Sequence, residues 1–241
     1  PEMSRGLGDV YKRQMKQMGF GSLYDVADVV TYKPEKSWNY EVGAHLSTPS
    51  HKVQADLALF YIDCRDQQLT VFPEGQITGR LMTNAGRTRS FGGEASLLAT
   101  LWRNLDLQVA YGYTRATFVK FDTGKADYAG NFIPYAPQHT LYAGASYTLR
   151  TGWNWLEYVI FRVAANGAGR IYWNEANTFS QPFYVLLEAS IRFEHRHWAV
   201  DVWGRNLTDT RYDTFYFMSI GNSFLQRGRP RTFGVSLSIT L

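Results

Sequence analysis

The stretch "PRTFGVSLSITL" (residues 230–241) alternates apolar and polar residues without a break. From Phe233 to Leu241 every second residue is apolar, and the residues between them are glycine, serine or threonine. Such alternation is typical of a β-strand with one face in an apolar environment and the other against water or polar groups. An ordinary chain terminus is loose and solvated, so we expect this strand to close a barrel.

The same period of two recurs through the chain. The other segments that show it are 38–47, 53–62, 91–102, 105–113, 140–149, 157–166, 184–193 and 198–207. Each is close to the ~9–11 residues that a tilted strand needs to cross a bilayer, and no run approaches the ~18 apolar residues of a membrane helix. The sequence therefore predicts an all-β fold, an antiparallel up-and-down transmembrane β-barrel segment of about nine strands.

The predicted connections alternate in length. Short ones are expected near 48–52, 103–104, 151–154 and 194–197, and long ones near 73–83, 122–137, 171–182 and 208–230. This alternation is typical of an up-and-down barrel, which has tight turns on one rim and longer loops on the other. Four tryptophans flank the short connections, namely Trp102, Trp153, Trp155 and Trp198. Indole rings favour the membrane interface, so these residues predict an aromatic girdle.

Composition excludes several other classes of protein. The 241 residues are 45% hydrophobic and 16% aromatic with a net charge of +4, which disfavours disorder and a nucleic-acid-binding patch. The single cysteine, Cys64, has no second cysteine to pair with and belongs to no zinc-like Cys-His cluster. The histidines have no ligand spacing, and no nucleophile–base–acid set emerges. We therefore expect no cofactor, no metal site and no enzyme activity.

Charged residues alternate with apolar ones in the predicted strands. A charge on a lipid-facing surface is costly, whereas a wet or plugged barrel interior accommodates it. We therefore expect a set of charged side chains to face the lumen: Glu188, Arg192, Asp201 and Arg205.

Four stretches resemble the C-terminal part of TonB-dependent outer-membrane receptors. They are "PEKSWNYEVG" (34–43), "NFIPYAPQHT" (131–140), "NLTDTRY" (206–212) and "GRPRTFGVSLSITL" (228–241). In the third stretch, the resemblance implies a structural role for Asn206, Asp209 and Tyr212. Asp209 can accept hydrogen bonds from nearby backbone N–H groups, and Tyr212 can anchor the base of the following loop.

The resemblance implies a 22-stranded barrel filled by an N-terminal plug domain. Residues 15–241 would be the C-terminal part of that barrel, and residues 1–14 are interpreted as a non-native or artefactual leader. The expected partners are outer-membrane lipid, together with the plug domain and TonB through a missing N-terminal region. The implied function is import of an extracellular ligand such as a ferric siderophore, haem, cobalamin or glycan, driven by TonB.

Aromatic and guanidinium groups in the long connections suit planar or anionic ligands. The candidate ligand-binding residues are Tyr172, Trp173, Tyr216, Phe217 and Arg227. The alternative for each aromatic residue is packing against other loop aromatics.

Two other classes of protein remain open at this stage. One is a small, self-contained outer-membrane porin or adhesion barrel. Single-chain bacterial barrels have even strand counts, so this alternative requires a further strand within 15–35. The other is a soluble β-sandwich binding module, which does not explain the alternation of short and long connections.

Overall fold

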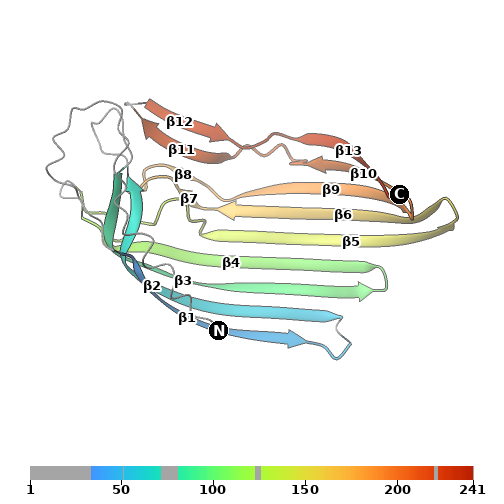
Figure 1. The fold of residues 1–241 in the computed structure, drawn as a ribbon, viewed down its shortest axis with the longest axis horizontal. Helices are drawn as coiled ribbons and strands as arrows, with labels where there is room; N and C mark the ends of the chain where they lie inside the picture. The colour runs from blue at the N-terminus through green and yellow to red at the C-terminus, as the bar shows by residue number, and fades with distance from the viewer. Residues whose placement is uncertain (1–33, 51, 72–80, 123–125, 220–221, 241) are drawn as a thin grey trace.

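Nine antiparallel strands form one continuous sheet in the computed structural model, which describes residues 34–50, 52–71, 81–122, 126–219 and 222–240 (Figure 1). The strands, in their order across the sheet, are β1 (Lys36–Ser47), β2 (Val53–Val71), β3 (Leu81–Trp102), β4 (Leu105–Lys120), β5 (His139–Trp153), β6 (Leu156–Gly169), β9 (Tyr184–His195), β10 (Trp198–Arg205) and β13 (Thr232–Ile239). Each pairs with the preceding sheet strand, so the order is up-and-down, and the predicted all-β class and count of nine are confirmed. Among the described residues, no helix is long and apolar enough to cross a bilayer.

The sheet has short turns at one end and long connections at the other (Figure 1). The long end carries two further hairpins, β7 (Ile171–Tyr172) with β8 (Ser180–Gln181), and β11 (Asp213–Ser219) with β12 (Asn222–Arg227). Two of the predicted long connections, 171–182 and 208–230, therefore each contain a hairpin of their own. Strand β3 also begins within the segment 73–83, because cross-strand hydrogen bonding continues beyond the stretch in which apolar and polar residues alternate.

From β6 to β13 the strand register keeps most apolar side chains on one face of the sheet and most charged side chains on the other. Leu187, Val202 and Leu237 lie on one face, because paired residues share a face and the side chains alternate along each strand. The large apolar side chains of this face are widely exposed; those of β13, for example, are 65–69% exposed (Phe233, Val235, Leu237 and Ile239). We call it the apolar face.

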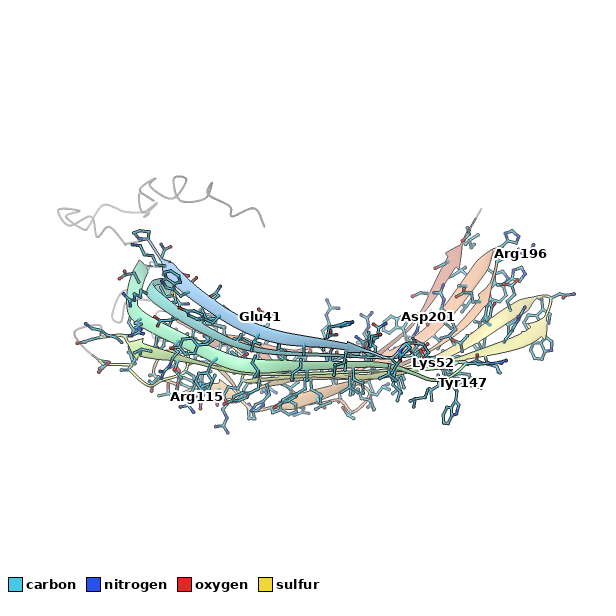
Figure 2. All side chains as sticks on the ribbon, turned by 90° about the horizontal axis from the view of Figure 1, so that it is seen from below. Glu41, Lys52, Arg115, Tyr147, Arg196 and Asp201 are labelled. Carbon is cyan, nitrogen blue, oxygen red and sulfur yellow. The ribbon has the colours of Figure 1, made fainter. Side chains whose placement is uncertain are left out.

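The opposite face, here called the polar face, carries the charged residues of most strands. Glu41 of β1 and Asp201 of β10 lie on the side toward which the sheet curves, and Tyr147 of β5 lies on the other side (Figure 2). The register from β6 to β13 places Glu188, Arg192 and Asp201 on this same face.

The best-buried side chain of the described residues lies in β4, at the end with the long connections. Phe118 is 1% exposed and packs on Phe121, with Tyr128 and Ile133 against them. The segment after β4 folds back over this strand: the Phe118 amide donates to the Asn131 carbonyl at 2.9 Å. A small hydrophobic core therefore fixes the connection between β4 and β5 onto the sheet.

The expectation that residues 1–14 are a leader falls outside the described residues. A further strand was considered within 15–35, and residues 15–33 of that range also lie outside them.

Candidate functional site: the polar face and the loop cluster

Side chains from three adjacent strands form a hydrogen-bonded row on the polar face. His45 Nδ1 of β1 lies 2.5 Å from Asp56 Oδ1 of β2, and the Ser96 hydroxyl of β3 donates to Asp56 Oδ2 at 3.0 Å. These residues stand opposite one another in the register, which explains why they meet. The hydrogen bonds hold these polar groups in place. The side chains are exposed, so they face outward from the sheet.

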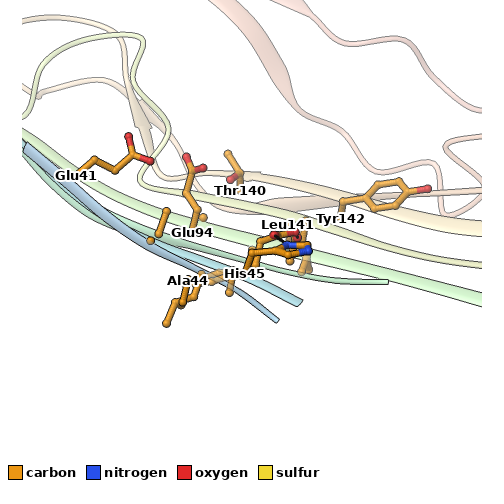
Figure 3. A pocket seen from close by; sticks show the side chains of 16 residues that line it. Glu41, Ala44, His45, Glu94, Thr140, Leu141 and Tyr142 are labelled. Atoms are coloured by element: carbon orange, nitrogen blue, oxygen red, sulfur yellow. Dashed lines mark hydrogen bonds and ion pairs between the residues drawn. The ribbon is translucent and has the colours of Figure 1, made fainter. Parts of the chain in front are cut away.

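A shallow groove of about 660 Å³ runs beside this row (Figure 3). Glu41 of β1, Glu94 of β3 and Thr140 of β5 project from the same side of the sheet into it. These two carboxylates and one hydroxyl make this part of the polar face acidic and able to form hydrogen bonds. Glycines at neighbouring positions, such as Gly112 between Glu94 and Thr140 in the register, leave the groove open.

The four charged residues predicted to face the lumen lie together on the polar face of β9 and β10. Arg192 stands opposite Asp201 in the register and donates from Nε to Glu194 at 2.8 Å. Glu188 accepts a hydrogen bond from the Asn166 amide, and the Arg205 guanidinium lies over the Trp203 ring at 4.7 Å. A second groove, of about 580 Å³, runs along this cluster.

One atom of this cluster has no hydrogen-bond partner. Asp201 Oδ1 is buried and is the only such side-chain atom among the described residues. A buried carboxylate oxygen without a donor is costly, so its environment favours a polar group from outside this sheet.

Three of the long connections meet in one aromatic cluster, which we call the loop cluster (Tyr135, Ile171, Trp173, Phe179 and Tyr216). Trp173 and Tyr216 are buried at 7% and 5% exposure, and Phe179 stacks on Tyr216 with ring centres 4.6 Å apart. The Tyr135 hydroxyl donates to the Tyr216 carbonyl at 2.7 Å. The cluster therefore ties the connection after β4 to the β7–β8 hairpin and to β11.

The five candidate ligand-binding residues are in different surroundings. Trp173 and Tyr216 have little surface left for a ligand, and Tyr172 is half-buried and stacks on Phe132 at 5.3 Å. Phe217 stacks on Phe224 at 4.9 Å, and Arg227 of β12 is exposed. Packing thus occupies much of the aromatic surface, and Arg227 presents its side chain to solvent.

Sequence reasoning missed the part played by the segment before β5. Phe132 and Tyr135 lie in the stretch "NFIPYAPQHT", which carried the family resemblance, but their ring contacts come from a connection far along the chain. Only the pairing of β4, β5 and β6 brings these connections together at one end of the sheet.

The Asn206 side chain organises the connection between β10 and β11. Its amide nitrogen donates to the Thr210 and Arg229 carbonyls at 3.0 and 3.1 Å, and its oxygen accepts from the Thr210 amide at 2.8 Å. Asp209 accepts from the Arg231 amide at 3.0 Å. These bonds join two segments more than twenty residues apart.

Tyr212 lies where the same connection meets β9. Its ring stacks on Tyr184 with centres 4.5 Å apart, and Gly228 lies so close that a Cβ there would overlap the Tyr212 ring. The contacts of Asn206, Asp209 and Tyr212 therefore favour the structural role expected for "NLTDTRY".

Replacing Asn206 with alanine is expected to lower the free energy of unfolding of the protein by about 2–3 kcal/mol, because three hydrogen bonds are lost at a 5% exposed site. Urea titration of the folded protein measures this loss. Thr208→Ala is the matched control, since Thr208 is exposed and its hydroxyl bonds only with the Thr210 hydroxyl. Equal losses for the two variants would contradict the role given to Asn206.

Among the described residues, no group of three or more histidine, cysteine, aspartate or glutamate side chains could hold a metal ion. His195 and His197 lie near each other in the turn before β10, with ring centres 5.8 Å apart.

Comparison with known proteins places this sheet among bacterial receptors. Residues 8–207 match the family described as "TonB dependent receptor-like, beta-barrel". The pesticin receptor of Yersinia pestis is 27% identical over 218 residues, which are 88% of this chain and 30% of the receptor. The ferrichrome outer membrane transporter/phage receptor of Escherichia coli is 24% identical over 163 residues, or 68% of this chain and 20% of that protein.

Solved structures share the fold. The ferric yersiniabactin uptake receptor FyuA from Yersinia pestis aligns with a TM-score of 0.71 at 24% identity, covering 85% of this chain and 30% of FyuA. The siderophore receptor PiuA from Acinetobacter baumannii aligns with a TM-score of 0.66 at 19% identity, covering 85% and 28%. The chain thus spans less than a third of the length of the relatives it matches.

Proposed function

Since the chain belongs to the family of TonB-dependent receptor β-barrels, we propose that it forms the C-terminal barrel segment of an outer-membrane receptor that imports an extracellular ligand. The observation that carries the proposal is the up-and-down sheet with one widely exposed apolar face. Relatives named as uptake receptors and transporters support the same function and give no indication of an enzyme.

In this proposal the apolar face contacts lipid and the polar face lines the lumen. Strands such as β1 and β9 have 12 residues, which is enough to cross the hydrocarbon region, and the shortest strands of the sheet, β10 and β13, have 8. Trp102, Trp153 and Trp155 are 56–71% exposed near the short turns, as expected for rings in a membrane interface. The long connections then lie on the extracellular side.

The polar face suits a plug domain supplied by the rest of the receptor. The groove beside Glu41 and Glu94 and the cluster around Asp201 offer charged and hydrogen-bonding groups to a polar surface. A donor on the plug, or a water held by it, would satisfy Asp201 Oδ1. Coupling to TonB would run through the plug.

For the ligand we propose a ferric chelate, because the relatives include receptors named for ferric yersiniabactin and ferrichrome. Arg227, Phe217 and Tyr172 would contribute to first contact, since guanidinium and ring groups suit anionic and aromatic chelators. Trp173 and Tyr216 would hold the three long connections in the conformation that binds.

Uptake of radioactive iron by cells that depend on the full-length receptor tests this function, with ferric yersiniabactin and ferrichrome as probes. Uptake is expected for at least one chelate, and it should fall to background when TonB is deleted. Arg227→Ala should lower the affinity for that chelate, whereas Arg196→Ala in a short turn should not.

Uptake of both chelates that persists without TonB would indicate a passive pore and overturn the proposal. Absence of uptake of any ferric chelate by a correctly inserted receptor would overturn the choice of ligand class.

A further inference from the structure

The apolar face of β1–β4 ends in a group of basic residues, which we call the basic belt (Lys36, Arg65, Arg87, Arg89 and Arg115). The register places Lys36, Arg65 and Arg87 directly opposite one another on three adjacent strands. Arg89 follows one row nearer the short turns, and Arg115 another row further. Figure 2 shows Arg115 on the side of the sheet opposite Glu41, which confirms that the belt belongs to the apolar face.

The belt concentrates like charges. Adjacent strands lie ~4.8 Å apart, so the three cations of the first row are anchored within roughly 10 Å of one another. Like charges directly opposite in a sheet destabilise it unless an anion lies between them. The belt therefore needs more negative charge than its own side chains supply.

A single carboxylate stands within the paired rows of the belt. Asp63 accepts from Arg87 Nε at 2.6 Å and from Arg87 Nη2 at 3.1 Å, and its side chain is only 13% exposed. Among the described residues, no other belt residue has a carboxylate within ion-pair distance, and Arg115 lies over the Phe132 ring at 5.5 Å. One carboxylate thus stands among five cations, and an external anion would complete their neutralisation.

Aromatic rings share the row of Arg115, which is the row of the belt nearest the short turns. Tyr40, Tyr61 and Phe91 form one row across β1–β3 and are 60%, 37% and 37% exposed. Tyr and Trp rings mark the boundary between hydrocarbon and headgroups. If the apolar face contacts lipid, the belt therefore lies at headgroup height, on the side of the long connections.

We propose that the basic belt binds the phosphate groups of a lipid headgroup in the outer leaflet. This inference rests on the proposed function, because it requires the apolar face to lie in the outer membrane. Arginine binds phosphate oxygens with two parallel N–H donors, and several arginines on a rigid sheet suit a headgroup with more than one phosphate. The headgroup would neutralise the charge of the belt. It would cover the apolar face between the aromatic row and the long connections.

The test uses the full-length receptor in detergent with diphosphoryl lipid A as the probe. The variant Lys36→Gln/Arg65→Gln/Arg89→Gln keeps the Asp63–Arg87 pair. The control Lys52→Gln/Arg103→Gln/Arg196→Gln removes the same charge from exposed positions at the short turns. Each cation near an anionic surface contributes about 1 kcal/mol, so the belt variant should bind roughly 10–100-fold more weakly at low salt, and the control within about twofold.

Two further measurements need no variant. Removal of both phosphates from lipid A should weaken binding to the wild-type receptor about as much as the belt variant does. Added salt should reduce the difference in affinity between the belt variant and the control. Inorganic phosphate at equal concentration should compete poorly, because it lacks the acyl chains that lie along the apolar face. Strong competition by inorganic phosphate would replace the lipid with a free anion as the ligand.

Equal affinity of the belt variant and the control, or equal affinity for phosphorylated and dephosphorylated lipid A, would overturn the inference. Membrane insertion is measured first by protection of the strands from external protease. A receptor that is absent from the outer membrane would overturn the proposed function, whereas an inserted receptor with unchanged lipid affinity would overturn only the role of the belt.

Discussion

Replacing Val235 with arginine is expected to lower the free energy of unfolding of the membrane-inserted receptor by about 2–4 kcal/mol. Val235 lies near the middle of β13 on the apolar face, is 68% exposed and stands opposite Val202. A guanidinium there would lie among acyl chains and would have to be drawn toward an interface. Urea titration in liposomes, followed by tryptophan fluorescence, measures the loss.

The neighbouring residue is the matched control. Ser236 lies on the polar face opposite Asp201, whose Oδ1 has no hydrogen-bond partner in the described structure. Ser236→Arg loses one bond, from Trp203 Nε1 to Ser236 Oγ at 3.2 Å, but brings a cation near that carboxylate. Ser236→Arg should therefore lower the free energy of unfolding by less than about 1 kcal/mol. Equal losses, or the reverse order, would show that the faces of β13 are assigned wrongly.

Replacing Trp173 with alanine is expected to destabilise the loop cluster by about 3–5 kcal/mol, the usual cost of removing a large buried aromatic side chain. Trp173 is 7% exposed and packs on Tyr135, whose ring centre lies 5.4 Å away. Without it the three long connections lose their shared core. Hydrogen exchange should rise in segments 126–137, 171–181 and 213–217, with little change in β5 or β6.

Variants of Trp173 also distinguish a structural role for this residue from direct contact with the ligand. Trp173→Phe keeps an aromatic ring in the cluster, so it should restore most of the protection and of the chelate uptake. If Trp173→Ala abolished uptake without any change in hydrogen exchange, Trp173 would contact the ligand directly. That result would contradict the role inferred from its burial.

The period of two was sufficient to predict the sheet. Residues such as Asp201 and Val202 alternate because each strand separates two environments, and this requirement acts on every residue of a spanning strand. The predicted segment 184–193 therefore agrees closely with β9, Tyr184–His195. The same reasoning placed Glu188 and Arg192 on one face before any pairing was known.

The parts beyond the alternating stretches could not be predicted in this way. Strands β2 and β3 pair as far as Val71 and Leu81, beyond the predicted segments 53–62 and 91–102, where apolar and polar residues no longer alternate strictly in the sequence. The β11–β12 hairpin lies within the predicted long connection 208–230, and the sequence pattern did not identify its two strands. The basic belt was missed because Arg65 and Arg89 are distant in sequence and meet only through the register.

The neighbour-to-neighbour pairing of the sheet has a consequence for how the protein assembles. Strands such as β1 and β2, or β9 and β10, are joined by short turns, so each pair can form as a hairpin before it meets the rest. The pairings of β2 with β3, β4 with β5, β6 with β9 and β10 with β13 span the long connections. Each doubling of such a connection costs only about 0.6 kcal/mol of closure entropy. The long connections can therefore lengthen or change in sequence while the order in which the strands assemble is preserved.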